Sequence, residues 1–267
     1  MELLGYIGAL IMGLTLGLIG GGGSILTVPI LVYLFHVDAV LATAYSLFIV
    51  GLVSTIGSVS HIRLGNIHWR TALVFGPPSI LAVYLTRAYL VPALPDPLFS
   101  IGSTEISKSL GMLVLFALLM IAAAYSMIRK PKSMAEGTGT AISFNYPLIL
   151  GEGLIVGMIT GLVGAGGGFL IIPALVILAK LPMKLAVGTS LIIIAAKSLI
   201  GFTGDLTGDE LIDWRFLLMF SGVAIVGIIA GSALSKRISN EKLKPAFGWF
   251  VLLMGVYIIG RELSVMT

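Results

Sequence analysis

Two glycine-rich stretches carry the groups of this sequence best suited to chemistry. Residues 17–31 read GLIGGGGSILTVPIL and residues 161–175 read GLVGAGGGFLIIPAL, so glycines, leucines and a proline recur in the same places 144 positions apart. Glycine leaves backbone N–H groups uncovered, and consecutive glycine amides form a concave nest for anions. The alternative is a close helix crossing, where glycine lets backbones touch. The repetition favours an anion site.

Each stretch runs into a helix start, near Ser24 in the first copy and near Gly168 in the second. Each helix is predicted to begin no later than its proline, Pro29 or Pro173, because proline suits a first helical turn. Two helix starts that face each other present unpaired N–H groups and partial positive charge to a small anion between them. Hydroxyls nearby add donors, although helix-to-helix hydrogen bonding explains any one of them equally well. The predicted binding residues are Gly20, Gly21, Gly22, Gly23, Ser24, Ser46, Gly164, Gly166, Gly167, Gly168, Thr189 and Ser190.

Lys197 is the one charged residue that has no place in a predicted loop. It lies between LIIIAA and SLIGF, about seven residues from the outer end of its apolar segment. An ionisable residue at this depth in a membrane marks a functional site, so Lys197 is predicted to bind substrate or to take part in coupling. A lysine that snorkels to the interface is the alternative. Weaker candidates for proton coupling are Glu152, His61 and Asp205, for each of which an interfacial role is the simpler interpretation.

Other chemistry lacks support in the sequence. The glycine runs follow no predicted strand and lack the Lys-Ser/Thr pair of a P-loop, which excludes the nucleotide-binding fingerprints. The three histidines have no metal-ligand spacing, and no Ser-His-Asp grouping is indicated. The sequence has no cysteine, so disulfides and thiol chemistry are excluded. We therefore expect no catalytic residue, no metal and no cofactor, and we do not predict an enzyme.

Composition indicates a membrane protein. Hydrophobic residues make up 58% of the 267 residues, charged residues only 10%, and the mean hydropathy is +1.10. The apolar runs are long and frequent enough to span a bilayer, and they leave no room for a soluble domain. The net charge of +4 lies mostly in short loops, so it carries information on topology and does not indicate nucleic-acid binding. The first apolar run follows no basic residue, so it is predicted to belong to the fold and not to a signal peptide.

The repeat divides the chain into two halves, and internal duplication of this kind is typical of transporters. Each half contains a short pair of segments and three longer ones: 3–19, 24–36, 40–60, 69–90 and 109–128, then 147–163, 169–180, 185–204, 214–235 and 245–261. The pieces after the glycines cover only about 20 Å of a hydrocarbon core that is ~30 Å thick. Each glycine stretch is therefore predicted to be the tip of a hairpin that enters the membrane and turns back. Further matching pairs are Ser46 and Ser190, Gly57 and Gly201, and, after one inserted residue, Trp69-Arg70 and Trp214-Arg215.

Loop charges predict the path through the membrane. Basic residues gather in the loops at 61–70, 180–184 and 236–244 and in the central linker, whereas acidic residues mark the loops at 36–39 and 205–213. With the basic loops in the cytoplasm, both termini lie outside and equivalent loops of the two halves lie on opposite sides. The prediction is an all-α polytopic membrane protein of two inverted-topology repeats. Residues 1–128 form the first repeat, 129–146 a cytoplasmic linker and 147–267 the second repeat, and residues 91–108 form an irregular outer cap.

The doubled glycine-proline motif, with Ser46, Thr189-Ser190 and the Trp-Arg pairs, resembles the TauE/SafE family of sulfite and organosulfonate exporters over nearly the whole chain. The resemblance implies a multi-pass permease of the cell inner membrane that moves small sulfur-containing anions by a secondary mechanism. Its partners are then a small anionic substrate and the lipid bilayer, with no nucleic acid, and no particular oligomeric state is predicted. At the position equivalent to Gly21 the second repeat has Ala165, and at the position equivalent to Lys197 the first repeat has Val53. The site is therefore not symmetric. An anion channel and an intramembrane enzyme acting on a lipid phosphate are the alternatives.

Overall fold

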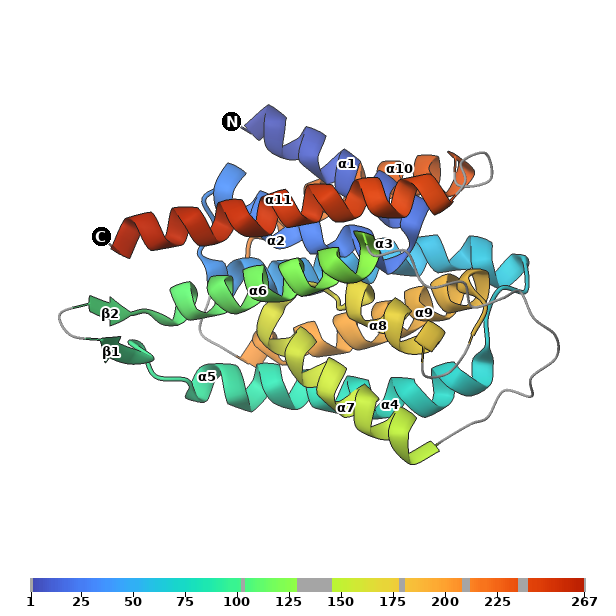
Figure 1. The fold of residues 1–267 in the computed structure, drawn as a ribbon, viewed down its shortest axis with the longest axis horizontal. Helices are drawn as coiled ribbons and strands as arrows, with labels where there is room; N and C mark the ends of the chain where they lie inside the picture. The colour runs from blue at the N-terminus through green and yellow to red at the C-terminus, as the bar shows by residue number, and fades with distance from the viewer. Residues whose placement is uncertain are drawn as a thin grey trace.

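The computed structural model describes residues 2–101, 104–128, 146–177, 181–207, 212–234 and 240–266, which are almost entirely helical (Figure 1). The first half contains α1 (Glu2–Ile19), the 3-10 helix η1 (Gly21–Leu26), α2 (Thr27–Leu34), α3 (Ala39–Arg63), α4 (Trp69–Leu85), the π-helix η2 (Thr86–Leu90), α5 (Val91–Ala93) and α6 (Lys108–Ile128). The second half contains α7 (Tyr146–Val163), α8 (Gly168–Ile177), α9 (Met183–Thr203), the 3-10 turn η3 (Asp205–Thr207), α10 (Trp214–Leu234) and α11 (Asn240–Met266).

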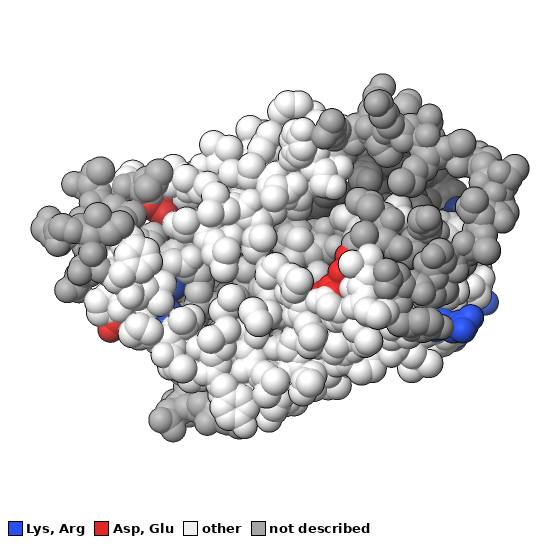
Figure 2. Space-filling model, turned by 60° about the horizontal axis from the view of Figure 1, so that its bottom comes forward, with Lys and Arg blue, Asp and Glu red and all other residues white. Residues whose placement is uncertain are grey.

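The helices confirm the predicted all-α polytopic membrane fold. Within the described residues, six helical stretches are long and apolar enough to cross a membrane, and two shorter apolar helices cover Gly23–Leu34 and Pro147–Val163. One face of the molecule shows a broad uncharged surface, with most of its visible charged atoms toward the two ends (Figure 2). The six stretches are Glu2–Ile19, Ala39–Arg63, Trp69–Ala93, Lys108–Ser126, Lys184–Thr203 and Trp214–Leu234.

Two predicted details differ from the structure. The outer segment at 91–108 is not irregular throughout, because it contains α5 and an antiparallel pair of strands, β1 (Phe99–Ile101) and β2 (Thr104–Ile106). The helix after the first glycine stretch does not begin as an α-helix, since η1 precedes α2. The predicted linker at 129–146 lies outside the described residues, apart from Tyr146 at the start of α7.

Helices of one half pack mainly on helices of the other. α1 packs along α10, α4 along α7, α3 along α9 and α6 along α11. In the sequence repeat α7 is the counterpart of α1 and α10 that of α4, so the α1–α10 contact has its equivalent in the α7–α4 contact. The equivalent glycines Gly13 and Gly157 each lie against the backbone of the partner helix, at Ala224 and Ser79 respectively. At these two positions glycine serves the close crossing of helices.

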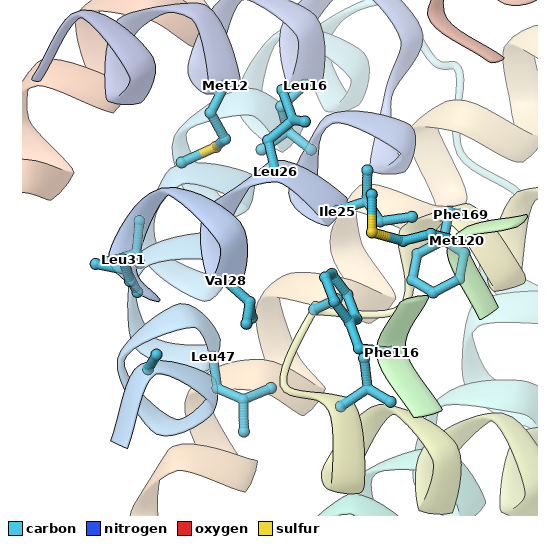
Figure 3. Packing of buried hydrophobic residues seen from close by; sticks show 14 of the residues in the cluster. Met12, Leu16, Ile25, Leu26, Val28, Leu31, Leu47, Phe116, Met120 and Phe169 are labelled. Atoms are coloured by element: carbon cyan, nitrogen blue, oxygen red, sulfur yellow. The ribbon is translucent and has the colours of Figure 1, made fainter. Parts of the chain in front are cut away.

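An apolar core surrounds the place where the two hairpins meet. Met12 of α1 lies beside Leu26 of η1 (Figure 3). Ile25 of η1 lies close to Met120 of α6 and to Phe169 of α8 (Figure 3). In a membrane protein these contacts stabilise through van der Waals packing between helices, because lipid tails are as apolar as the side chains. This packing holds the glycine stretches of both halves in one layer, between α3, α6 and α9.

Candidate anion-binding site

The two glycine tips meet, as the repeat predicts. A methyl group added to Gly21 would collide with the backbone of Gly168, and one added to Gly168 would collide with the backbone of Gly21. The sequence also predicts an anion between the tips, but these two backbones are already in contact. An ion therefore has no room between Gly21 and Gly168, and any anion held by the tips would have to lie beside this contact.

Each tip also packs against the long central helix of the other half. Gly20, with φ +79°, lies against Val187 of α9, and its counterpart Gly164, with φ +72°, lies against Thr43 of α3. Only glycine adopts this left-handed backbone without strain and also leaves room for a neighbour so close. The tips are therefore equivalent in position.

The first tip uses its polar groups internally. Gly23 N donates to Gly20 O at 3.4 Å as η1 forms. The Ser24 hydroxyl donates to Gly21 O at 2.8 Å, and the Thr27 hydroxyl donates to Ser24 O at 3.1 Å. A hydroxyl that already donates its proton to a carbonyl has no second proton for an anion. Gly22 lies inside the same 3-10 helix.

The second tip leaves its amides open. Gly166 and Gly167 have φ of +63° and +67°, and neither N–H has a hydrogen-bond acceptor among the described residues. The tip is anchored at its start, where Gly164 N donates to Thr160 O at 2.8 Å. It is anchored at its end by α8, whose first residues donate to Gly167 O. Between these anchors the backbone presents N–H groups of the kind that bind anions.

Lys197 lies directly against this open tip. Its side chain is 0% exposed, and its ammonium donates to Thr160 Oγ1 at 3.0 Å. A methyl group placed on Gly167 would lie 2.7 Å from Lys197 Nζ. Because the side chain is buried in the helix bundle, it does not extend along the surface as a snorkelling lysine does. In the part of the chain that the structure describes, no carboxylate is within ion-pair distance of Lys197.

Of the predicted hydroxyl groups, that of Ser46 lies next to the second glycine tip. Thr43 and Val50, one helical turn before and after it on α3, contact Gly164 and Gly166 respectively, so Ser46 faces the second tip. Its Oγ is buried and has no hydrogen-bond partner among the described residues. A buried polar atom without a partner costs about 1–3 kcal/mol, so such an atom marks a place for a ligand or water.

The other two predicted hydroxyls have partners within the protein. The Ser190 hydroxyl donates to Val187 O at 2.8 Å, one turn back on α9. Thr189 Oγ1 accepts from His68 N at 2.9 Å and so ties α9 to the segment before α4. Thr189 therefore faces away from the tips.

None of the three coupling candidates contacts a tip glycine directly among the described residues. His61, in the last turn of α3, lies beside Gly188 of α9, and its Nδ1 is buried without a partner among the described residues. Glu152 lies on α7 eight residues before Thr160, or about 12 Å along the helix. Asp205 begins η3 and forms an ion pair with Arg87. Their role in coupling stays a prediction.

Arg87 is the functional candidate that sequence reasoning missed. The prediction that Lys197 alone lacks a place in a loop is wrong, because Arg87 in η2 is also buried, with 1% exposure. Its Nε donates to both carboxylate oxygens of Asp205 at 2.8 and 2.9 Å, and its Nη1 donates to Thr43 Oγ1 at 2.9 Å and to Gly161 O at 3.2 Å. In the sequence Arg87 stands near the end of a predicted segment, as an interfacial residue does. The available signal was Asp205 at another segment end, since a buried arginine requires a carboxylate.

Comparison with known proteins identifies the family. The family model for "Sulfite exporter TauE/SafE" matches residues 5–258. A "Probable membrane transporter protein" of Xylella fastidiosa is 30% identical over 259 residues, which cover 94% of this chain and 92% of that protein. "Probable membrane transporter protein YunE" of Bacillus subtilis is 25% identical over 268 residues, 94% of each chain. A "Probable membrane transporter protein" of Haemophilus influenzae is 26% identical over 268 residues, again 94% of each chain.

No solved structure gives a significant match to this chain. The family match spans both glycine tips, Lys197 and the Arg87–Asp205 pair, and it runs from the first helix to the last. The relatives are matched over nearly their whole length, and the six apolar stretches agree with their description as membrane proteins. This chain therefore belongs to the TauE/SafE sulfite exporter family and is a multi-pass membrane transporter, not an enzyme.

Proposed function

We propose that this chain is a secondary transporter that exports a small sulfur oxyanion, such as sulfite or an organosulfonate, across the cell inner membrane. We place the anion at the second glycine tip. The main support for the proposal is the buried position of the Lys197 ammonium beside this tip. The ammonium is buried beside Gly167 and donates, among the described residues, one hydrogen bond, to Thr160.

The balance of charge supports an anionic substrate. A buried cation is costly unless an opposite charge neutralises it. Arg87 has Asp205 for this purpose, but within the described residues Lys197 has no such carboxylate. An ammonium has three N–H donors, and one of them is used on Thr160. The other two, with the amides of Gly166 and Gly167, match the acceptor oxygens of a sulfite or sulfonate group.

The repeat supports one site and not two. The counterparts of Lys197 and Thr160 in the first half are Val53 and Leu16, both fully buried and apolar. The first tip has therefore lost the cation and has closed its backbone as η1. We expect one anion for each chain.

The helix packing supports the inverted arrangement of the halves, with 1–128 and 147–267 as the two repeats. The α1–α10 and α7–α4 contacts are equivalent, and the tips meet between the two hairpins. Both chain ends lie toward the same end of the molecule as the β1–β2 pair, whereas α7 begins toward the opposite end (Figure 1). With the charge rule for cytoplasmic loops, this predicts extracytoplasmic termini.

Cysteine labelling tests this topology in a chain that has no cysteine of its own. Cysteines at positions 2 and 267 are expected to react with a membrane-impermeant thiol reagent in intact cells. A cysteine at position 132, in the linker, is expected to react only after the cells are opened. Labelling at position 132 alone in intact cells would reverse the proposed orientation.

A thermal-shift screen of the purified protein tests the substrate class. Sulfite or a small sulfonate at about 100 times its Kd is expected to stabilise the protein by roughly 2.7 kcal/mol, whereas chloride at equal ionic strength gives no comparable gain. The rise in Tm with sulfate, thiosulfate and several sulfonates, compared with that with sulfite, identifies the preferred oxyanion. If no sulfur oxyanion raises the Tm above the chloride control, the proposed substrate class is wrong.

A further inference from the structure

A second buried cation lies at the other end of the open tip. Arg87 donates to Thr43 Oγ1, and Thr43 in turn lies against Gly164, the first residue of the tip. Lys197 lies against Gly167, three residues further along. A chain of three residues spans at most about 11 Å. The two cations therefore stand within a short path of each other, joined by a strip of glycine backbone.

Asp205 covers Arg87 on its outer side. Arg87 is 1% exposed, whereas the Asp205 side chain is 15% exposed, so the carboxylate lies between the guanidinium and the surface. η2 leads directly into α5, which lies at the same end of the molecule as both termini (Figure 1). Arg87 and Asp205 therefore lie on the side of the second tip that faces this end of the molecule.

The geometry of the pair is that of an oxyanion site. Arg87 Nε and Nη2 both reach the carboxylate of Asp205, with Nε at 2.8 and 2.9 Å from its two oxygens and Nη2 at 2.5 Å from one of them. A guanidinium fork binds any planar or pyramidal oxyanion group in this way, a sulfonate or sulfite as well as a carboxylate. The carboxylate of Asp205 thus occupies the position in which the guanidinium of Arg87 could bind the oxyanion group of a substrate.

We propose that Arg87 is a second anion subsite, between the Lys197 site and the outer end, in which the oxyanion group of the substrate replaces the carboxylate of Asp205. The inference rests on the proposed function for its choice of ligand. Displaced from Arg87, Asp205 turns toward the solvent that it already reaches. Arg87 then keeps a counter-ion both before and after the exchange, so its own buried charge stays paired.

The test measures the Tm of purified variants in a background that lacks the Lys197 site. In Lys197→Met, the additional change Asp205→Ala uncovers Arg87 and lowers the Tm. We expect sulfite to restore it by at least about 3 °C at saturation beyond a chloride control of equal ionic strength. Adding Arg87→Met to these two changes removes the cation, and the response to sulfite is expected to disappear.

Asp38→Ala in the same Lys197→Met background is the matched control. Asp38 caps α3 by accepting from Val40 N, so its loss destabilises the protein without uncovering a buried cation. A sulfite response of the Asp205 variant no larger than that of the Asp38 variant would overturn the proposal. If Asp205→Ala is lost on extraction, Asp205→Asn serves in its place, because it keeps the shape and removes the charge. Since Lys197 is absent from all these proteins, failure of the Lys197 site leaves the outcome unaffected.

Discussion

Replacing Lys197 by methionine is expected to weaken sulfite or sulfonate binding by about 1–3 kcal/mol, or roughly 5- to 150-fold in Kd. Methionine keeps the length and the apolar stem but has no charge and no N–H donor. The ammonium acts where the dielectric is low and salt does not screen it, so its loss is not compensated by water. Calorimetric titration of the purified protein in detergent measures the change.

The same substitution is not expected to harm the fold. Among the described residues the Lys197 ammonium is a buried charge with one hydrogen bond and no carboxylate partner, so removing it is expected to leave the Tm equal to or above that of the wild type. Lys197→Arg should recover only part of the affinity, because the planar fork does not fit the place of a compact ammonium. Lys184→Met on the same helix, where the lysine is exposed, is the matched control and should bind normally. Wild-type affinity in Lys197→Met would remove Lys197 from the site.

Gly168→Ala is expected to have the second large effect, through the contact between the tips. Its methyl group would lie on the backbone of Gly21, where no flexible side chain exists to move aside. Overpacking of this kind costs about 1–3 kcal/mol, or roughly 2–12 °C in Tm for a protein of this size. Because the hairpins must separate to admit the methyl group, transport should fall by more than the loss of folded protein explains. Tm and sulfite flux per folded molecule measure the two effects separately.

Gly222→Ala in α10 is the control for this prediction. A methyl group at Gly222 meets no atom within 4 Å, so the substitution adds helix propensity without a collision. Its Tm and flux should match or exceed those of the wild type. A Gly168→Ala protein that behaves like Gly222→Ala would show that the tips need no close contact. Gly21→Ala, which makes the collision from the other side, should reproduce the defect of Gly168→Ala.

The architecture could be predicted because its signals are local and repeated. Glycine runs followed by a proline mark the hairpin tips, and the ten apolar segments agree with the helices to within a few residues, apart from the longer ends of α11. The meeting of the tips follows from two equivalent hairpins in one chain. Such features depend on backbone preference and on the thickness of the bilayer, both of which the sequence expresses directly.

The details of the site depend on packing that sequence patterns do not express. Ser46 and Ser190 occupy matching positions, yet Ser46 Oγ is unpartnered among the described residues while the Ser190 hydroxyl bonds to its own helix. Adjacent residues such as Thr189 and Ser190 point about 100° apart on a helix, so the sequence motif could not decide which faces the tip. Arg87 was missed because the apolar helical stretch continues through η2 and α5 to Ala93. Arg87 is therefore buried within this stretch, whereas at the end of a shorter helix it would be exposed.

Flux of radiolabelled sulfite into liposomes that contain the purified protein tests the central claim most directly. We expect uptake that saturates with sulfite concentration, is competed by small sulfonates, and is strongly reduced in Lys197→Met but not in Lys184→Met. Flux that rises linearly without saturation would favour an anion channel over a carrier. Uptake equal to that of empty liposomes, by a wild-type protein whose thermal unfolding shows it to be folded, would contradict the assignment of sulfite as its substrate.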